Sequence, residues 1–305
     1  MNPIQVEDKM TARLLTGAEV AGEILEELRA EVARLKKDYG AIPGLATILV
    51  GEHPASRCYI DAKRRAARGL GLRSVEFDLP PDLPEDELFP LIDRCNKDAE
   101  IDGVLVQLPL PCHLNESSVL CAIDPGKDVE AHHPVNIGKL MTGDAGFLPC
   151  APAAVQELLI RSGVQLAGAE VVVLGRSNAI GKPLANMLLQ KSERADATVT
   201  VCHTATRDLT LHTARADVLI VAVGVPGFLR GGMIRPGAVV IDAGANDVGR
   251  SADGRRIVRG DVTLEEVAAV ASAVTPVPGG VGPLKIPMLM RNVLHACKIH
   301  RNIVH

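Results

Sequence analysis

The sequence is poor in aromatic residues. Its 305 residues include no tryptophan and two tyrosines, and aromatic side chains make up 2% of the chain. The formal net charge is −4 at pH 7. Proteins that bind nucleic acid rely on a basic surface and on rings that stack on bases. The composition therefore argues against nucleic acid as a partner.

Long apolar runs and paired cysteines are also lacking. No apolar stretch has the roughly 20 residues that a membrane-spanning helix needs, and residues 1–15 lack the apolar centre of a signal peptide. The seven cysteines include no Cys-x-x-Cys pair, which disfavours a disulfide framework or a zinc cage. The neighbouring side chains of His132 and His133 should diverge, so we expect no metal site. We expect a cytoplasmic protein with no membrane partner.

The sequence does contain alternating helix and strand patterns, which are typical of α/β proteins. Apolar residues recur at helical spacing over residues 17–39, and the apolar run 44–50 predicts a buried strand. A second strand is predicted near residues 73–79 and a helix over residues 84–97. A Gly/Pro-rich stretch at residues 142–152 predicts a hinge.

We therefore predict two α/β domains that flank a cleft, in keeping with the length of the chain. The first domain comprises residues 1–152 and a C-terminal helix, 284–305, that returns to it. The second, residues 153–283, is predicted to be a Rossmann-like nucleotide-binding domain. Its first strand runs into a glycine-rich turn that contains Gly175 and Gly181, where a pyrophosphate would lie on a helix N-terminus.

The nucleotide is predicted to be NADP. Rossmann folds that prefer NAD usually carry an acidic residue after the second strand, whereas here the residues are His203 and Thr204. Arg176 and this polar pair would suit a 2′-phosphate. Gly224 and Gly244 follow two further predicted strands, where glycine would let a nicotinamide approach the backbone.

Tyr59 and Lys63 are the candidate proton-transfer residues of the first domain. They lie four residues apart on a predicted helix, so the phenol and the amine can point into the same space. An incidental pair on a surface helix is the competing interpretation. Gln107 follows a buried strand at 104–106, where ligands bind in open α/β sheets, although a polar residue that merely ends the strand would look the same.

With these elements in order, the sequence resembles the bifunctional methylenetetrahydrofolate dehydrogenase/methenyltetrahydrofolate cyclohydrolase family over nearly its whole length. Tyr-x-x-x-Lys also marks short-chain dehydrogenases, but there it follows the nucleotide fold, whereas Tyr59 precedes it. The segments that carry the resemblance are Val50-Gly51, Pro54-Ala55-Ser56, Tyr59-x-x-x-Lys63, residues 103–111, Asp128-Val129, His133-Pro134, Pro149-Cys150, Gly175-Arg176-Ser177, Gly181-x-Pro183, Cys202-His203, residues 236–242 and residues 276–283.

The resemblance implies a role for each matching residue. Lys63 would be the general acid/base of the cyclohydrolase step, with Tyr59 and Gln107 shaping its proton state, and Asp128 would hold the pterin ring. The remaining expected contacts are Pro278, Gly279 and Gly282 of the folate loop, and Arg176, Ser177 and Thr204 on the NADP phosphate side. A homodimer joined through the nucleotide domain is also implied.

The sequence departs from the family pattern at several positions of the expected site. Glu130-Ala131 stands where the family has Asp-Gly, Ala151 replaces a threonine, and Gly282-Pro283-Leu284-Lys285 replaces Gly-Pro-Met-Thr. We expect Lys285 to be a substrate-binding residue, although its side chain could instead extend from the last helix to solvent. These departures leave two alternatives open, which are a dehydrogenase without hydrolase activity or with an altered substrate, and a nucleotide-binding regulator without turnover.

Overall fold

The computed structural model describes residues 12–51, 54–251 and 254–303. The chain divides into two compact units. The unit that we call the N-terminal unit comprises residues 21–153 and 285–303. The unit that we call the central unit comprises residues 12–20 and 154–284.

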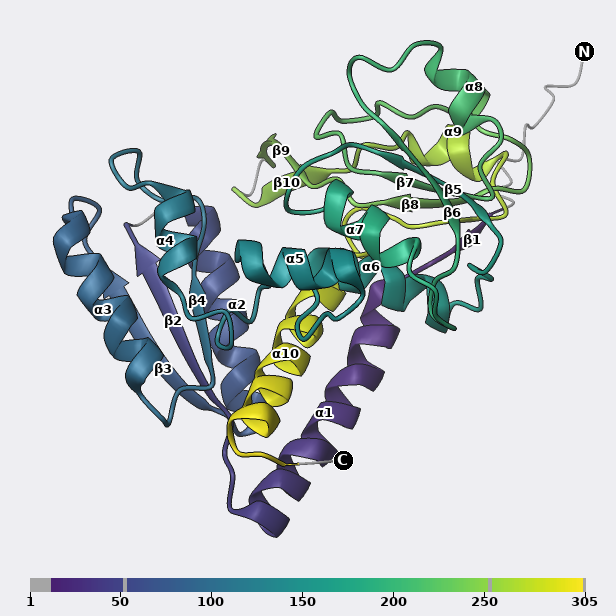
Figure 1. Cartoon of the computed structure of the whole chain (residues 1–305). Coiled ribbons are helices and arrows are strands. Elements are labelled where there is room, and N and C mark those ends of the chain that lie inside the picture. Colours follow the sequence, from purple (N-terminus) through teal and green to yellow (C-terminus); the bar gives the residue numbers. More distant parts are fainter. Residues whose placement is uncertain (1–11, 52–53, 252–253, 304–305) are drawn as a thin grey trace, which may run out of the picture. The chain divides into compact units, whose positions relative to one another are not determined.

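The N-terminal unit is built on a three-stranded parallel sheet in the order β3-β2-β4. Its strands are β2 (Gly44–Val50), β3 (Arg73–Leu79) and β4 (Gly103–Val106). All residues of β2 and β4 are buried, because helices cover both faces of the sheet. Figure 1 shows α3 (Glu85–Lys97) and α4 (Glu116–Ala122) on one side of the sheet, and α2 (Pro54–Leu70) and α10 (Lys285–His300) on the other.

Three further helices belong wholly or partly to this unit. They are α1 (Gly17–Tyr39), α5 (Pro134–Thr142) and α6 (Cys150–Arg161). The side chain of Asn292 in α10 ties the last helix to the loops before α5 and α6, because its amide donates to the carbonyls of Val129 and Leu148, both at 2.8 Å. Residue 129 is therefore fixed from two sides, by its own turn and by the C-terminal helix.

The central unit contains a six-stranded parallel sheet in the order β1-β11-β8-β7-β5-β6. In Figure 1 the short helices α8 and α9 lie on one side of this sheet and α7 on the other. An antiparallel hairpin of β9 and β10 follows β8. The elements are β1 (Arg13–Leu14), β5 (Glu170–Leu174), α7 (Gly181–Leu188), β6 (Thr198–Cys202), α8 (Leu209–Thr213), β7 (Val218–Val221), η1 (Gly231–Met233), β8 (Val239–Asp242), β9 (Asn246–Arg250), β10 (Arg256–Arg259), α9 (Leu264–Ala268), β11 (Ala273–Val274) and η2 (Gly282–Leu284).

One part of the expected domain division is wrong. The sequence predicts one domain for residues 1–152, but Arg13 and Leu14 pair with Ala273 and Val274 and so extend the sheet of the central unit. The strand has two residues, too few for a hydrophobic period to be visible in the sequence. Among the described residues, no helix is long and apolar enough to cross a membrane, and no group of three or more His, Cys, Asp or Glu could hold a metal ion.

Candidate active site

Lys63 lies at the centre of a polar cluster in the N-terminal unit. Its Nζ atom lies 2.8 Å from Oε1 of Glu130 and 3.2 Å from Oε1 of Gln107. The side chains of Lys63 and Glu130 are 14% and 20% exposed, so solvent screens their ion pair only in part. The structure thus brings Lys63 and Gln107 together, as the sequence predicted, and adds a carboxylate.

The backbone around β4 explains why Gln107 and Glu130 face Lys63. Gln107 directly follows β4, its backbone N–H donates to the carbonyl of Ile48, and its side-chain amide nitrogen donates to the carbonyl of Leu108 at 2.6 Å. Its side-chain oxygen is thereby left to accept from Lys63. Residues 127–131 run beside β4 through a hydrogen bond from Val104 to the carbonyl of Lys127, which places Glu130 at the same end of the sheet.

Charges in this cluster shift the pKa of Glu130. Burial alone would raise it, but the positive charges of Lys63 and His132, a hydrogen bond from Lys63 and the charge of Lys285 outweigh burial and lower it. The Nδ1 atom of His132 lies 4.0 Å from Oε2 of Glu130. Glu130 is therefore a carboxylate at neutral pH, and it faces more than one cationic side chain.

Lys285 belongs to the same electrostatic cluster. Burial and then the charge of Lys63 lower the pKa of Lys285, while Glu130 and Cys150 act in the opposite direction. Lys285 begins α10 and is partly buried. That Lys285 binds the substrate stays a prediction, because partial burial of the residue also suits a side chain whose apolar stem is covered while its amine reaches solvent. Burial also raises the pKa of the Cys150 thiol, so this side chain is neutral.

Asp128 and Tyr59 are placed differently from Lys63. Asp128 is 2% exposed, and its Oδ2 atom accepts hydrogen bonds from the backbone N–H of His133 at 2.7 Å and from the amide of Asn136 at 2.9 Å. Tyr59 is 49% exposed and lies one turn before Lys63 in α2. Sequence reasoning treated Glu130 only as a departure from the family pattern, although the structure makes it the carboxylate partner of Lys63.

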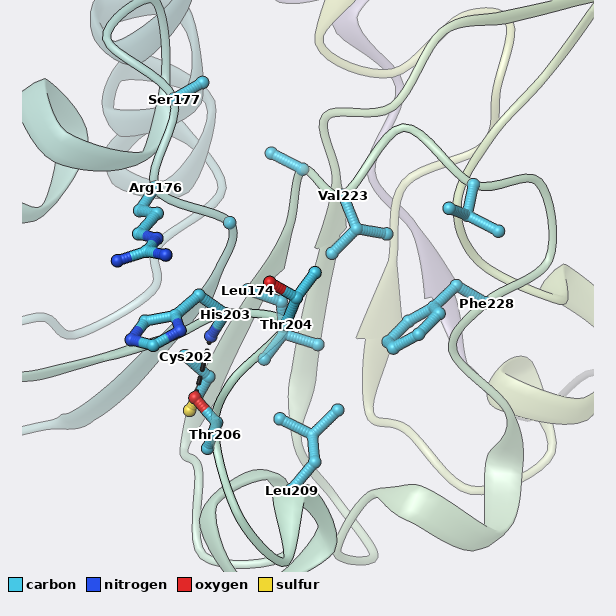
Figure 2. Close-up of a pocket in the computed structure, with 13 residues that line it drawn as sticks. Leu174, Arg176, Ser177, Cys202, His203, Thr204, Thr206, Leu209, Val223 and Phe228 are labelled. Atoms are coloured by element: carbon cyan, nitrogen blue, oxygen red, sulfur yellow. Dashed lines mark hydrogen bonds between the residues drawn. The ribbon is translucent and has the colours of Figure 1, made fainter.

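A second candidate site is a cavity of about 540 Å³ in the central unit. It lies where β5, β6 and β7 end, and Figure 2 shows the side chains of Arg176 and His203 next to each other at its edge. Arg176 and Thr204 are exposed and His203 is partly buried, so a charged ligand could reach all three. The lining residues are Leu174, Gly175, Arg176, Ser177, Cys202, His203, Thr204, Thr206, Leu209, Ala222, Val223, Val225 and Phe228.

The turn at the edge of this cavity requires glycine at two positions. Gly175 has φ +116°, and a Cβ atom there would come within 2.2 Å of the carbonyl oxygen of Ala222. A Cβ on Gly181 would meet the carbonyl oxygen of Gly175 at the same distance. The hydroxyl of Ser177 accepts hydrogen bonds from Ile180 and Gly181, which closes the turn at the start of α7.

Gly224 and Gly244 are not among the residues that line this cavity, but the backbone N–H of each donates a hydrogen bond to a buried carboxylate. Asp261 accepts hydrogen bonds from the backbone of Val223 and Gly224 through Oδ2, at 2.7 and 2.9 Å. Asp242 accepts from the backbone of Gly244 at 2.9 Å and of Asp261 at 3.0 Å. The sequence offered no signal for Asp261, because an isolated Gly-Asp pair is common in loops.

The loop of residues 276–283 belongs to the central unit. Two backbone hydrogen bonds hold its shape. The N–H of Gly17 donates to the carbonyl of Gly279 at 2.7 Å, and the N–H of Gly280 donates to the carbonyl of Pro276 at 2.8 Å. Pro278, Gly279 and Gly282 are partly buried or exposed. That these three residues contact a folate stays a prediction.

Comparisons with known proteins agree with the two-part organisation. Residues 15–130 match the family model of the tetrahydrofolate dehydrogenase/cyclohydrolase catalytic domain, and residues 149–301 match that of its NAD(P)-binding domain. The bifunctional protein FolD of Syntrophobacter fumaroxidans is 59% identical over 294 residues, which cover 96% of this chain and 100% of that protein.

Two crystal structures are also similar to this chain. One is the bifunctional enzyme FolD, methylenetetrahydrofolate dehydrogenase/cyclohydrolase, from Campylobacter jejuni, with a TM-score of 0.87, 42% identity and coverage of 94% of this chain and 99% of that one. The other is the Trypanosoma brucei N5,N10-methylenetetrahydrofolate dehydrogenase-cyclohydrolase in complex with NADP cofactor and inhibitor, with a TM-score of 0.88, 39% identity and coverage of 94% and 98%.

Proposed function

The chain belongs to the tetrahydrofolate dehydrogenase/cyclohydrolase family, and from this premise we propose that it catalyses both reactions of that name. It oxidises 5,10-methylenetetrahydrofolate with NADP and hydrolyses the resulting 5,10-methenyltetrahydrofolate to 10-formyltetrahydrofolate. The observation that carries the proposal is the cluster in which Lys63 contacts Gln107 and Glu130. A partly buried amine with a carboxylate and an amide beside it can exchange protons with a reacting water or ring nitrogen.

The dehydrogenase step uses the cavity of the central unit. The glycine turn at Gly175 and Gly181 and the start of α7 suit a pyrophosphate. Arg176, Ser177, His203 and Thr204 offer donors for a 2′-phosphate, and no carboxylate is among the residues that line the cavity. NADP, when bound, supplies the hydride acceptor, while the residues of this chain hold and orient it. Gly224 and Gly244 leave room beside the nicotinamide.

The cyclohydrolase step uses the N-terminal unit. Water adds to the carbon of the methenyl cation and loses a proton, and the ring nitrogen that leaves this carbon gains one. Lys63 exchanges these protons, and Gln107 and Tyr59 orient the reacting groups. The carboxylate of Glu130 favours binding of a cationic intermediate, because it offsets the positive charge of the neighbouring amines.

The remaining residues of the proposed folate site are Asp128, Pro278, Gly279, Gly282 and Lys285. The carboxylate of Asp128 is already shared by two donors of its own unit, so only its other oxygen would be available for a pterin. We further propose a homodimer joined through the nucleotide domain, as the family resemblance implies, and a cytoplasmic location, with which the net charge of −4 and the composition agree.

Two assays on the purified protein test the proposal. Reduction of NADP in the presence of 5,10-methylenetetrahydrofolate should be saturable in both compounds, and 5,10-methenyltetrahydrofolate should lose its absorbance faster than in buffer alone. If only NADP reduction occurs, the chain is a dehydrogenase without hydrolase activity. If NADP binds and neither reaction occurs, the chain is a nucleotide-binding regulator and the proposal is wrong.

A further inference from the structure

The side-chain amide of Asn292 joins two loops beside the candidate active site. Its Nδ2 atom lies 2.8 Å from the carbonyl oxygen of Val129 and 2.8 Å from that of Leu148. Asn292 belongs to α10 and is 7% exposed. Both neighbours are carbonyl oxygens, which only accept hydrogen bonds, so the end of the amide that faces them is the NH₂ group. One N–H group of the amide therefore serves each loop.

The carbonyl of Val129 also faces a thiol. The Sγ atom of Cys150, at the start of α6, lies 3.5 Å from this oxygen and 3.8 Å from Nδ2 of Asn292. Val129 is fully buried, and Cys150 and Asn292 are nearly so. The three residues thus form a closed cluster of the N-terminal unit. Loss of the amide would deprive two buried carbonyls of a donor, which destabilises the arrangement of both loops.

The chain turns sharply where it leaves this cluster. The backbone N–H of Ala131 donates to the carbonyl of Asp128 at 3.1 Å. Ala131 is fully buried and has φ +56°, a left-handed conformation that a residue with a Cβ atom adopts at a cost. Such a conformation persists only where the surrounding contacts fix it. The bond from Asn292 fixes the backbone two residues before Ala131, and Glu130 lies between.

We propose that Asn292 is a positioning residue that acts through Glu130. Its hydrogen bond fixes Val129, the neighbour of Glu130 in the chain, and so holds the carboxylate at 2.8 Å from the Nζ atom of Lys63. The amide of Asn292 uses its donors on backbone carbonyls, so it affects the site only by placing the loop. This inference rests on the proposed function, in which Lys63 exchanges protons during hydrolysis of 5,10-methenyltetrahydrofolate.

The two partners of Lys63 should respond differently to the loss of this amide. A charge-assisted hydrogen bond between an amine and a carboxylate is strongest at about 2.7–2.9 Å, so a shift of the loop would weaken the contact with Glu130. The side chain of Gln107 is held separately, because its amide nitrogen donates to the carbonyl of Leu108 at 2.6 Å. The contact of Lys63 with Gln107 therefore does not depend on Asn292.

A double-mutant cycle on folding stability tests the position of Glu130 without substrate. Lys63→Met and Glu130→Gln each remove one side of the contact, so their combined effect on the unfolding equilibrium constant should differ from the product of the single effects by about fivefold. In Asn292→Leu, which has a similar volume and no donor, this coupling should vanish. The coupling of Lys63→Met with Gln107→Leu should remain. Coupling between Lys63 and Glu130 that persists in Asn292→Leu would overturn the proposal.

Asn96→Leu is the matched control. Asn96 lies in α3 of the same unit, and its amide donates to the carbonyl of Ala122 at 2.8 Å, outside the cluster around Lys63. It should lower the denaturant midpoint and leave the coupling between Lys63 and Glu130 unchanged. If Asn96→Leu also abolishes this coupling, the loss reflects general destabilisation and the proposal is wrong.

Asn292→Ser provides the same test in a milder form, also for the case that Asn292→Leu does not fold. A serine hydroxyl has one donor, so it can serve one of the two carbonyls. The coupling between Lys63 and Glu130 should be smaller than in the wild type and larger than in Asn292→Leu. The full wild-type coupling in Asn292→Ser together with a lowered denaturant midpoint would mean that Asn292 contributes to stability alone.

The kinetic test asks whether the position of Glu130 matters for the reaction. Asn292→Leu should lower kcat of methenyltetrahydrofolate hydrolysis by about tenfold, because the contact that directs Lys63 is lost, and should leave Kd for NADP unchanged. In the Glu130→Gln background the same substitution should cause no further loss. An equal loss in both backgrounds would contradict a role through the carboxylate.

The two measurements separate this inference from the proposed function. If the coupling depends on Asn292 while the wild type hydrolyses no methenyltetrahydrofolate, the proposed function fails and the placement of Glu130 by Asn292 holds. If the wild type is active but shows no coupling between Lys63 and Glu130, the proposed function stands and the role of Asn292 is wrong.

Discussion

The Nζ atom of Lys63 lies 2.8 Å from Oε1 of Glu130, although 67 residues separate them in the chain. The contact joins α2 to the segment that runs beside β4. An amine held in this way has a fixed direction and a partner that can stabilise its charge. The geometry therefore supports a role in proton transfer more than one in surface charge.

Replacement of Lys63 by methionine should separate the two activities. Lys63→Met keeps the length and apolar stem of the side chain but removes the amine. We expect hydrolysis of methenyltetrahydrofolate to fall by about 100-fold or more, because no group at this position can exchange a proton. NADP reduction should persist in part, since the cavity of the central unit is untouched. Steady-state assays of both reactions on the same preparation provide the measurement.

Lys97→Met is the control for this variant, because Lys97 lies on α3 with a side chain that is 76% exposed. It should leave both activities unchanged. If Lys63→Met hydrolyses methenyltetrahydrofolate at the wild-type rate, the role given to Lys63 is wrong. If both activities vanish while the protein remains folded, Lys63 serves substrate binding rather than the hydrolytic step.

The preference for NADP should depend on Arg176. This side chain is exposed at the edge of the cavity, next to His203 (Figure 2). Arg176→Ala should lower the preference for NADP over NAD by roughly 10- to 100-fold, which corresponds to the loss of one charge-assisted hydrogen bond of about 1.5–3 kcal/mol. Titration calorimetry with each nucleotide measures this directly.

Arg230→Ala is the matched control for the cofactor experiment. Arg230 belongs to the same unit and pairs with Glu266 at 3.5 Å, outside the residues that line the cavity. Its removal should leave both nucleotide affinities unchanged. Equal affinity of the wild type for NADP and NAD would contradict the assignment of the cofactor.

The sequence was sufficient for the elements whose local patterns are strong. The helix over 17–39 and the strands 44–50 and 73–79 have the predicted bounds, because apolar periodicity and flanking Gly and Pro residues decide them locally. The resemblance to the family placed Lys63 beside Gln107. Neither the local sequence patterns nor the family resemblance indicated that Glu130 would face Lys63, because that contact depends on how residues 127–131 turn beside β4.

Other features depend on tertiary structure alone. The pairing of Arg13 with Ala273 joins opposite ends of the chain, and a two-residue strand has no period of its own. The contact between Lys63 and Glu130 likewise joins segments that are 67 residues apart, so it depends on tertiary packing that no local sequence pattern encodes.

Asp242 should make the stability of the protein depend on pH near 6. Burial raises the pKa of this carboxyl to about 6, although three backbone N–H groups favour the charged form. Because the native pKa lies above the unfolded value, the stabilising contribution is complete below pH ~4 and is lost as pH rises through about 6. A shift of roughly 2 units corresponds to about 3 kcal/mol.

The comparison that isolates this effect is between the wild type and Asp242→Asn. We expect the free energy of unfolding of the wild type to fall relative to that of the variant between pH 4 and 7, by about 3 kcal/mol. Denaturant titrations at several pH values measure the difference. Asp247→Asn removes an exposed carboxylate whose pKa is lowered by the backbone of Gly249 and by Arg256, so the difference between the wild type and this variant should stay nearly constant over this pH range and fall only below about pH 4. A constant difference for Asp242→Asn would contradict the prediction.

Asp261 should control NADP binding without touching the cofactor. It is fully buried and accepts hydrogen bonds from the backbone of Val223 and Gly224 and from the amide of Asn246 at 2.7 Å. Val223 lines the cavity. Asp261→Ala leaves these donors without an acceptor, so the turn should lose its fixed position. We expect Kd for NADP to rise about tenfold, or roughly 1.4 kcal/mol.

Two further variants distinguish positioning from general loss of stability. Asp261→Asn keeps one oxygen for the turn and should bind NADP more tightly than Asp261→Ala does. Asp217→Ala removes a carboxylate that accepts from the backbone of Glu170 at 2.8 Å, at the opposite end of β7 from Val223. It should lower the melting temperature to a similar extent and leave Kd for NADP unchanged. If Asp217→Ala weakens NADP binding as much as Asp261→Ala, the effect reflects stability of the sheet, and Asp261 does not position the turn.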